Sequence, residues 1–160
     1  MTAPTPAWDE FAAALRTELS RLGDGMTVVI VWKERSWLSA QFAQGRQSLW
    51  AEVSGQRLGD AEYTRADTPE DRRILGSHGW LPPDPAETFW WHRTVAYPPT
   101  SAEYREIVAG VVAALRDVNG VPGPEHLGYR AWEALEGNRY RTLDLPGVEA
   151  LPLRAPGAPA

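Results

Sequence analysis

Apolar residues recur at helical spacing in two long stretches of the chain. In residues 8–22 they fall at steps of three and four, the spacing of one helix face, and Gly23 follows as a stop signal. A second stripe runs through residues 104–118, behind the capping-box pattern of residues 100–103. Residues 68–71 have a threonine, a proline and two acids in the order that begins a helix. The pattern therefore predicts two main helices and one short helix.

Alternation of apolar and polar residues predicts strands elsewhere in the chain. Residues 26–32 are β-branched and almost all apolar, which is typical of a strand covered on both faces. Residues 37–44 and 48–54 alternate on either side of Gly45-Arg46, a pair with the Gly-first form of a type II′ hairpin turn. The pattern therefore predicts a three-stranded antiparallel meander. Three more segments have the character of strands: residues 61–63, 89–95 and 126–132.

The two turns of the meander predict which residues face the helices. A turn at Gly45-Arg46 pairs Phe42 with Leu49 and puts the apolar residues of both strands on one face. If Trp32 pairs with Trp37 across the preceding turn, alternate residues of the first strand join that face. Those residues are Thr27, Val29 and Val31. The opposite face then carries Val28 and four larger apolar residues among polar ones: Ile30, Trp32, Trp37 and Trp50.

This opposite face is too apolar for a plain solvent-exposed surface, which leaves two interpretations. In the first, a helix or the returning chain covers this face. In the second, the face binds a peptide, a partner protein or a second copy of the chain, and binding of a second copy would make a homodimer. The chain has eight tryptophans, and tryptophan is enriched at binding hot spots. The four residues just named are therefore the candidate peptide-binding residues, whereas we expect Trp8 and Trp80 to lie in the core.

Residues 75–92, which we call the central turn, join the two halves of the sequence. Proline lacks the backbone N–H and restricts the residue before it, so the two prolines after Gly79-Trp80 require a turn. Because the segment carries three tryptophans, we expect it to be buried and to hold the two halves together. Its candidate structural residues are Leu75, Gly79, Trp80, Pro82, Trp90 and Trp91.

Composition narrows the class of protein. The 160 residues fit one domain, which we place at residues 7–144, between a flexible N-terminus and a disordered Pro- and Ala-rich tail at residues 145–160. The formal charge of −5 and the absence of a basic cluster argue against nucleic acid or an anionic membrane as a partner. The chain has no cysteine and no apolar run long enough to cross a bilayer, so we expect a cytoplasmic protein.

Candidate catalytic chemistry is sparse. The three histidines are isolated in the sequence, and only His78 and His92, with Glu87 or Asp84, stand near enough to suggest a metal site. Ser77 lacks the Gly-x-Ser-x-Gly frame of a hydrolase nucleophile. We therefore predict no catalytic residue, no metal and no cofactor. A small hydrolase or metalloenzyme that uses His78 and His92 is the alternative.

The order of elements and a few motifs resemble a known superfamily. The residues that carry the resemblance are Trp8 and Phe11, Leu75, Gly79-Trp80, Pro82-Pro83, Trp90-Trp91 and the helical stripe of residues 104–115. Over residues 7–132 the chain resembles the YbjN and type III secretion chaperone-like superfamily, in particular its actinobacterial TY-Chap members. The resemblance implies an α+β fold in which an antiparallel sheet with a three-stranded meander packs on two main helices and one short helix.

The resemblance also implies a non-enzymatic function, the binding of an extended segment of a partner protein that is held or escorted. The expected partner is a secreted or toxic protein. A further alternative is an interaction protein that neutralises a toxin or has a structural role. Such a protein differs from a chaperone because it binds one folded target tightly.

Overall fold

A computed structural model describes residues 6–55, 57–58, 64–65 and 68–144 of the chain. Its helices are α1 (Pro6–Leu19), α2 (Pro69–Ser77) and α3 (Ser101–Val112), with a π-helical continuation η1 (Ala113–Asn119) and a 3₁₀ turn η2 (Pro124–His126). The strands are β1 (Met26–Trp32), β2 (Arg35–Gln44), β3 (Ser48–Val53), β4 (Arg57–Leu58), β5 (Thr64–Arg65), β6 (Trp91–Ala96), β7 (Leu127–Leu135) and β8 (Arg139–Thr142).

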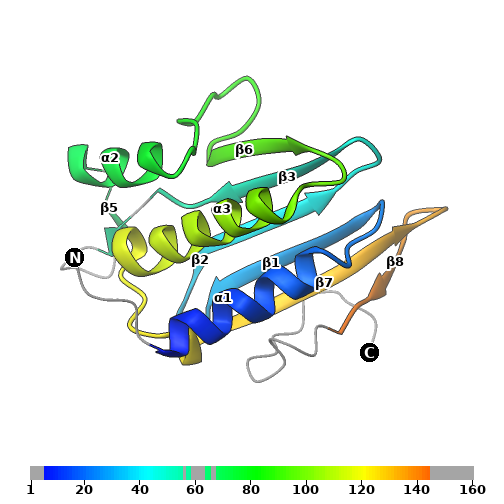
Figure 1. Ribbon diagram of the computed structural model, residues 1–160, viewed down its shortest axis with the longest axis horizontal. Coiled ribbons are helices and arrows are strands. Elements are labelled where there is room, and N and C mark those ends of the chain that lie inside the picture. Colours follow the sequence, from blue (N-terminus) through cyan, green and yellow to red (C-terminus); the bar gives the residue numbers. More distant parts are fainter. Residues whose placement is uncertain (1–5, 56, 59–63, 66–67, 145–160) are drawn as a thin grey trace.

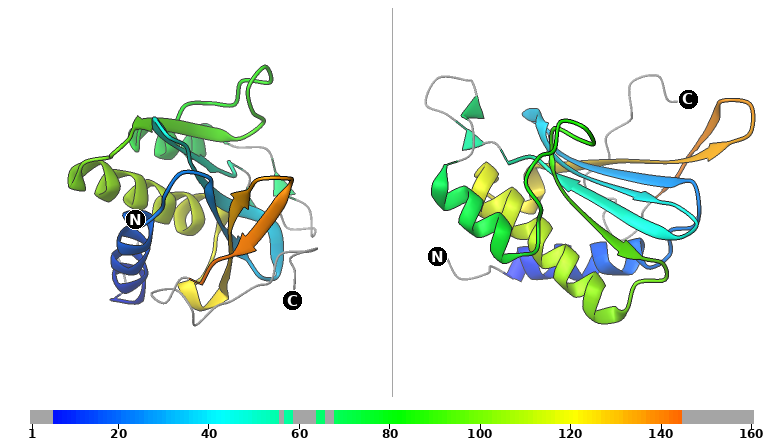
Figure 2. Two further views of the ribbon diagram at one scale, coloured as in Figure 1. Left: turned by 90° about the vertical axis from the view of Figure 1, so that its right-hand side faces the viewer. Right: turned by 90° about the horizontal axis from the view of Figure 1, so that it is seen from above.

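Six of the strands form one antiparallel sheet in the order β6-β3-β2-β1-β7-β8. The views in Figures 1 and 2 place α1 and α3 side by side on the same face of this sheet, while α2 lies toward the β6 edge and packs against η1. The predicted α+β class, with a three-stranded meander, two main helices and one short helix, is confirmed.

The core fills the space between the sheet and the helices. Apolar residues of α1, α3 and η1, among them Leu15, Val111 and Leu115, are completely buried against the strands. Trp8 is 2 % exposed and meets Phe11 edge to face, at 5.8 Å between ring centroids. The predicted core position of Trp8 is therefore confirmed, and its pairing with Phe11 fixes the first turn of α1 to the core.

The hairpin between β2 and β3 is two residues out of the predicted register. The backbone N–H of Gly45 donates to Ser48 O at 2.9 Å, so Arg46-Gln47 forms the turn instead of Gly45-Arg46. Phe42 consequently pairs with Ala51 rather than with Leu49. Since a shift of two residues returns each side chain to its own face, the predicted faces of β2 and β3 are retained.

On β1 the predicted face is wrong. The register between β1 and β2 shifts at Val31/Trp32, and beyond this irregularity Ile30 pairs with Ala40. Three residues of β2, 36–38, lie between Ser39, the partner of Val31, and Arg35, the partner of Trp32. An odd number of extra residues reverses the alternation, because successive side chains of a strand point to opposite faces. Ile30 and Trp32 therefore join the helix-covered core, and Val29 and Val31 take the opposite face.

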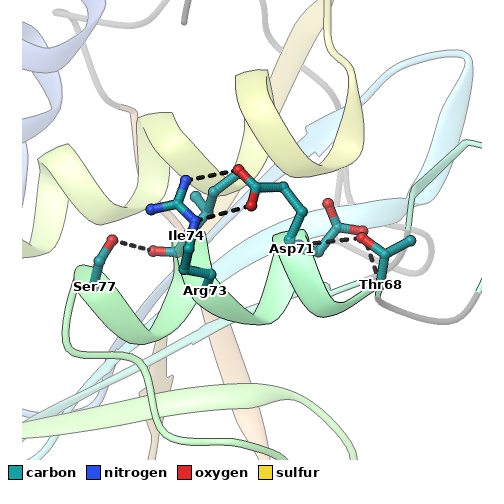
Figure 3. A network of polar contacts seen from close by, with 6 residues as sticks. Thr68, Asp71, Arg73, Ile74 and Ser77 are labelled. Carbon is teal, nitrogen blue, oxygen red and sulfur yellow. Dashed lines mark hydrogen bonds and ion pairs between the residues drawn. The ribbon is translucent and has the colours of Figure 1, made fainter.

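Capping boxes begin the second and third helices, where the sequence predicts a threonine cap at Thr68 and a capping box at Thr100. Thr68 accepts a hydrogen bond from the backbone N–H of Asp71, whose carboxylate accepts one from the N–H of Thr68 (Figure 3). Thr100 and Glu103 form the same reciprocal pair at α3. Along α2, Arg73 binds Glu70 and the Ser77 hydroxyl donates to Ile74 O at 2.7 Å (Figure 3).

The central turn is buried only in part. Leu75, Trp80 and Trp91 lie in the core, with exposed fractions of 0 %, 2 % and 5 %. The loop between them does not pack as expected, because Pro82 is exposed and Trp90 is only half-buried. Phe89, at 80 % exposed, is accessible to solvent. Two of the three tryptophans thus anchor the segment, while residues 81–89 form a surface loop.

Glycines let the two anchoring tryptophans approach the backbone closely. A Cβ at Gly110 of α3 would lie 2.8 Å from Trp80 Nε1, and one at Gly55 would lie 2.5 Å from Trp91 Cδ1. Gly79 has a φ of +80°, a conformation that favours glycine. Next to it, Arg93 of β6 donates a hydrogen bond to His78 O at 3.1 Å, and its Nη2 lies 3.7 Å from Glu106 Oε2 of α3. These contacts tie the central turn to β6 and to α3.

Several predictions fall outside the described residues, namely the short strand at residues 61–63, most of the flexible N-terminus and the tail at residues 145–160. The strand β8, by contrast, is not predicted. In the described part of the chain, no helix is long and apolar enough to span a membrane.

Candidate functional site

The sheet face that points away from α1 and α3 is the candidate site, and we call it the outer face. The strand register assigns its residues, because side chains alternate between the two faces. Its central members are Thr27, Val29 and Val31 of β1, Gln41 and Ala43 of β2, Trp50 and Glu52 of β3, His92 and Thr94 of β6, and Arg130 and Trp132 of β7.

An aromatic pair occupies one side of the outer face. The rings of Trp50 and His92 stack at 5.1 Å between centroids and 8° between planes. They are diagonal neighbours on β3 and β6, since Trp50 pairs with Thr94 across the strands. Trp50 is half-buried, so part of its indole ring remains available for contact.

The His92 ring is held by its surroundings. Its Nδ1 lies 3.2 Å from Trp90 O, and its Nε2 lies 3.8 Å from Glu87 Oε2. Its backbone exchanges two hydrogen bonds with Leu81, at 2.8 Å and 3.1 Å. Because His92 is 6 % exposed and fixed on several sides, it sets the plane against which Trp50 rests.

A second tryptophan stands on the same cross-strand row as Trp50. Trp50 pairs with Ala43, Ala43 pairs with Thr27, and Thr27 pairs with Trp132. Two large aromatic side chains therefore flank two short ones, with about 14 Å between the outer strands at the usual strand spacing. Trp132 is half-buried, as Trp50 is. Such a row offers apolar contact area along a line that crosses the strands.

The neighbouring row is more polar at its ends. His92 pairs with Glu52, Glu52 with Gln41, Gln41 with Val29, and Val29 with Arg130. Within the described part of the chain, the Nε atom of Arg130 is buried and has no hydrogen-bond partner. The outer face thus combines aromatic surface with a guanidinium group.

The four candidate peptide-binding residues do not share one face. Trp50 lies on the outer face, whereas Ile30 and Trp32 belong to the core between the sheet and the helices. On the outer face itself, Val29 and Val31 are also buried, at 5 % and 1 % exposed, so the surface available to a peptide is that of the half-buried Trp50 and Trp132. The backbone of Trp37 is part of β2, but its side chain lies outside the described part of the structure. Sequence reasoning missed Trp132, although the alternation of residues 126–132 already placed it opposite Tyr129.

The residues of the alternative enzymatic hypothesis are not brought together. His92 lies on the outer face, while His78 lies against Gly110 of α3 on the helix side. Burial lowers the pKa of His78, an effect opposed by Asp117 and reinforced by Arg116. Among the described residues, no three side chains of His, Cys, Asp or Glu are grouped so that they could hold a metal ion. The Ser77 hydroxyl is engaged by Ile74 O within α2.

Comparison with known proteins gives one match. The model of the family TY-Chap3, described as "T3SS (YopN, CesT) and YbjN peptide-binding chaperone 3", matches residues 1–133. No curated protein and no solved structure matches the chain significantly. The matched segment includes α1, the meander, α2, β6, α3 and most of β7, and hence every residue of the two rows on the outer face from β6 to β7. The chain therefore belongs to the TY-Chap3 family of YbjN- and type III secretion chaperone-like peptide-binding chaperones.

Proposed function

We propose that this protein holds or escorts a partner protein by binding an extended apolar segment of it on the outer face. The observation that carries the proposal is the aromatic row, in which the half-buried Trp50, stacked on His92, and Trp132 flank Ala43 and Thr27. Large amphipathic rings supply contact area at little cost in side-chain entropy, which is why they act as anchors in binding surfaces.

The geometry favours binding on the face over the addition of a strand at the β6 edge. Leu81 already exchanges two backbone hydrogen bonds with His92, so the outer edge of β6 is occupied at that point. The prolines at positions 98 and 99 remove further backbone donors just beyond the strand. An extended peptide would meet fewer free backbone groups here than a full edge strand offers.

The partner we propose is a secreted or toxic protein that must be kept from folding or acting too early. The family description, which names type III secretion chaperones, supports a secreted partner. The proposal involves no catalytic step and no cofactor.

A titration of the partner segment tests the proposal. Proteins cross-linked to the tagged chain in its native host are identified by mass spectrometry, and the cross-linked segment is synthesised with a fluorophore. Its Kd is then measured for the wild type, for Trp50→Ala/Trp132→Ala and for Phe89→Ala. Phe89, 80 % exposed on the surface loop, is the matched aromatic control.

We expect the double variant to bind at least about thirtyfold more weakly, because truncation of each aromatic anchor costs roughly 1–2 kcal/mol or more. Phe89→Ala should bind as the wild type does. Far-ultraviolet circular dichroism shows whether the double variant keeps its fold. A Kd within twofold of the wild-type value in the folded double variant would contradict the proposed site.

A further inference from the structure

One end of the outer face is buried, although the main helices lie on the other side of the sheet. Val31 of β1 pairs there with Ser39 of β2 and with Gly128 of β7, and we call these three residues the third row. Val31 is 1 % exposed, yet it does not belong to the core between the sheet and the helices. Since α1 and α3 pack on the opposite face, another part of the molecule buries this row (Figures 1 and 2).

The neighbours of Val31 within its row are too small to bury it. Glycine has no side chain and serine has a short one, so a valine between them on a bare sheet would remain open to solvent. Thr27 provides the comparison on the same face. It lies between Ala43 and the large Trp132, and yet it is less buried than Val31. The contrast points to cover that lies above the third row rather than within the sheet.

The chain leaves its last strand in the direction of the third row. The backbone N–H of Leu143 donates to Ala131 O at 2.9 Å, which extends the pairing of β8 with β7 by one residue. In this antiparallel register Asp144 stands across from Arg130, on the side of the outer face. Each further residue in the same direction approaches Gly128.

Residues 145–153 have the length and the composition to cover that row. Four of them are large and apolar: Leu145, Val148, Leu151 and Leu153. Pro146-Gly147 is the dipeptide of a type II turn, which would redirect the chain out of the line of β8. An extended segment of this length spans about 30 Å, whereas β8 and β2 are three strand spacings, or about 14 Å, apart.

We propose that residues 145–153 fold back across the outer face and cover its third row, with Leu151 and Leu153 against Val31. Burial of these side chains removes apolar surface from water, and covalent attachment at the end of β8 gives the segment a high effective concentration. This docking goes beyond the proposed function. The aromatic row stays open to a partner, whereas a partner segment that reaches the third row must first displace residues 145–153.

A single introduced thiol reports on this cover, because the chain has no cysteine of its own. Ser39→Cys places a thiol of similar size on the third row, where a buried thiol reacts slowly. Its rate of reaction with a maleimide is measured in the 160-residue chain and in two variants of it. One variant carries Leu151→Asp/Leu153→Asp. The matched control carries Ala155→Asp/Ala158→Asp, which adds the same charge beyond the proposed segment.

We expect Leu151→Asp/Leu153→Asp to raise the rate by at least about tenfold, because burial of two carboxylates is costly and the segment no longer stays in place. The control should react within about twofold of the parent. Equal rates in all three proteins would overturn the proposal. So would a rate that rises only when Trp37→Ser is introduced, since another part of the chain would then supply the cover. A rate that rises on dilution would identify a second copy as the occupant and would equally overturn it.

Methyl NMR of the unsubstituted chain decides the matter even if Ser39→Cys does not fold. In a sample with ¹³C-labelled valine and leucine methyl groups, docking predicts nuclear Overhauser effects between Val31 and Leu151 or Leu153. Their absence would contradict the docking. Neither experiment contains a partner, so failure here leaves the proposed function standing, and loss of partner binding in the Trp50→Ala/Trp132→Ala test does not depend on the outcome.

Discussion

Replacement of Gly110 by alanine tests how the central turn is packed against α3. Alanine in a helix interior is normally more stable than glycine, by about 0.5–1 kcal/mol. At Gly110 the added methyl group would lie 2.8 Å from Trp80 Nε1, 3.2 Å from Trp80 Cε2 and 3.4 Å from His78 Cβ. Trp80 is 2 % exposed and packed on all sides, so it cannot yield freely. The usual stabilisation should therefore be reversed.

The size of the reversal follows from the two opposing terms. Insertion of a methyl group into a well-packed core costs about 1–3 kcal/mol, from which the helical gain is subtracted. We expect Gly110→Ala to lower the free energy of unfolding by about 1 kcal/mol. Gly76 in α2 is the matched control, because a Cβ there meets nothing within 4 Å. Gly76→Ala should raise the free energy of unfolding by about 0.5–1 kcal/mol.

Urea unfolding followed by circular dichroism measures both variants. The difference between the two variants isolates the contact with Trp80, since the helical term is common to both, and it should amount to about 2 kcal/mol. If Gly110→Ala stabilises the protein as much as Gly76→Ala does, the close contact between α3 and Trp80 does not exist. The account of how the central turn is anchored would then be wrong.

Three further predictions concern stability. In urea unfolding, Trp80→Ala should lower the free energy of unfolding by about 3–5 kcal/mol, whereas Trp50→Ala, on the outer face, should lower it by about 1 kcal/mol. Equal losses in the two variants would contradict the faces assigned to these tryptophans. Thr68→Ala should cost about 1 kcal/mol in the same assay, because it removes the acceptor for the Asp71 N–H. Burial lowers the pKa of His78, so the unfolded chain binds a proton at this histidine more readily than the folded chain does. The free energy of unfolding should therefore fall as the pH drops below about 6.5. Between pH 7.5 and 5.5, unfolding curves of His78→Gln should therefore show a smaller loss of stability than those of the wild type, and an equal loss would refute this cause.

The elements of the fold follow from local sequence, because caps and periodicity act within a few residues. The threonines at positions 68 and 100 cap α2 and α3 as the sequence predicts. The strands of the meander are likewise found where alternation places them. What local sequence does not reveal is register, and the irregularity at Val31/Trp32 reverses the face of β1 without any proline or glycine to announce it.

The same limit explains the candidate site. Trp50 is assigned to the outer face from its own alternation, which the shift of two residues at the hairpin leaves intact. The faces of Ile30 and Trp32 depend on the pairing of β1 with β2, so the irregularity at Val31/Trp32 places both in the core. Trp132 and Arg130 join the site only because β7 pairs with β1, a contact between segments about one hundred residues apart that no local pattern encodes.

Indole NMR signals provide the most direct test of the outer face as the binding site. Each of the eight tryptophans gives one indole N–H resonance in a ¹⁵N-labelled sample, and single substitutions assign them. On addition of the partner segment identified by cross-linking, the account predicts that the signals of Trp50 and Trp132 shift or broaden, while those of the buried Trp8 and Trp80 stay in place. Saturable binding that leaves Trp50 and Trp132 unchanged would contradict the account.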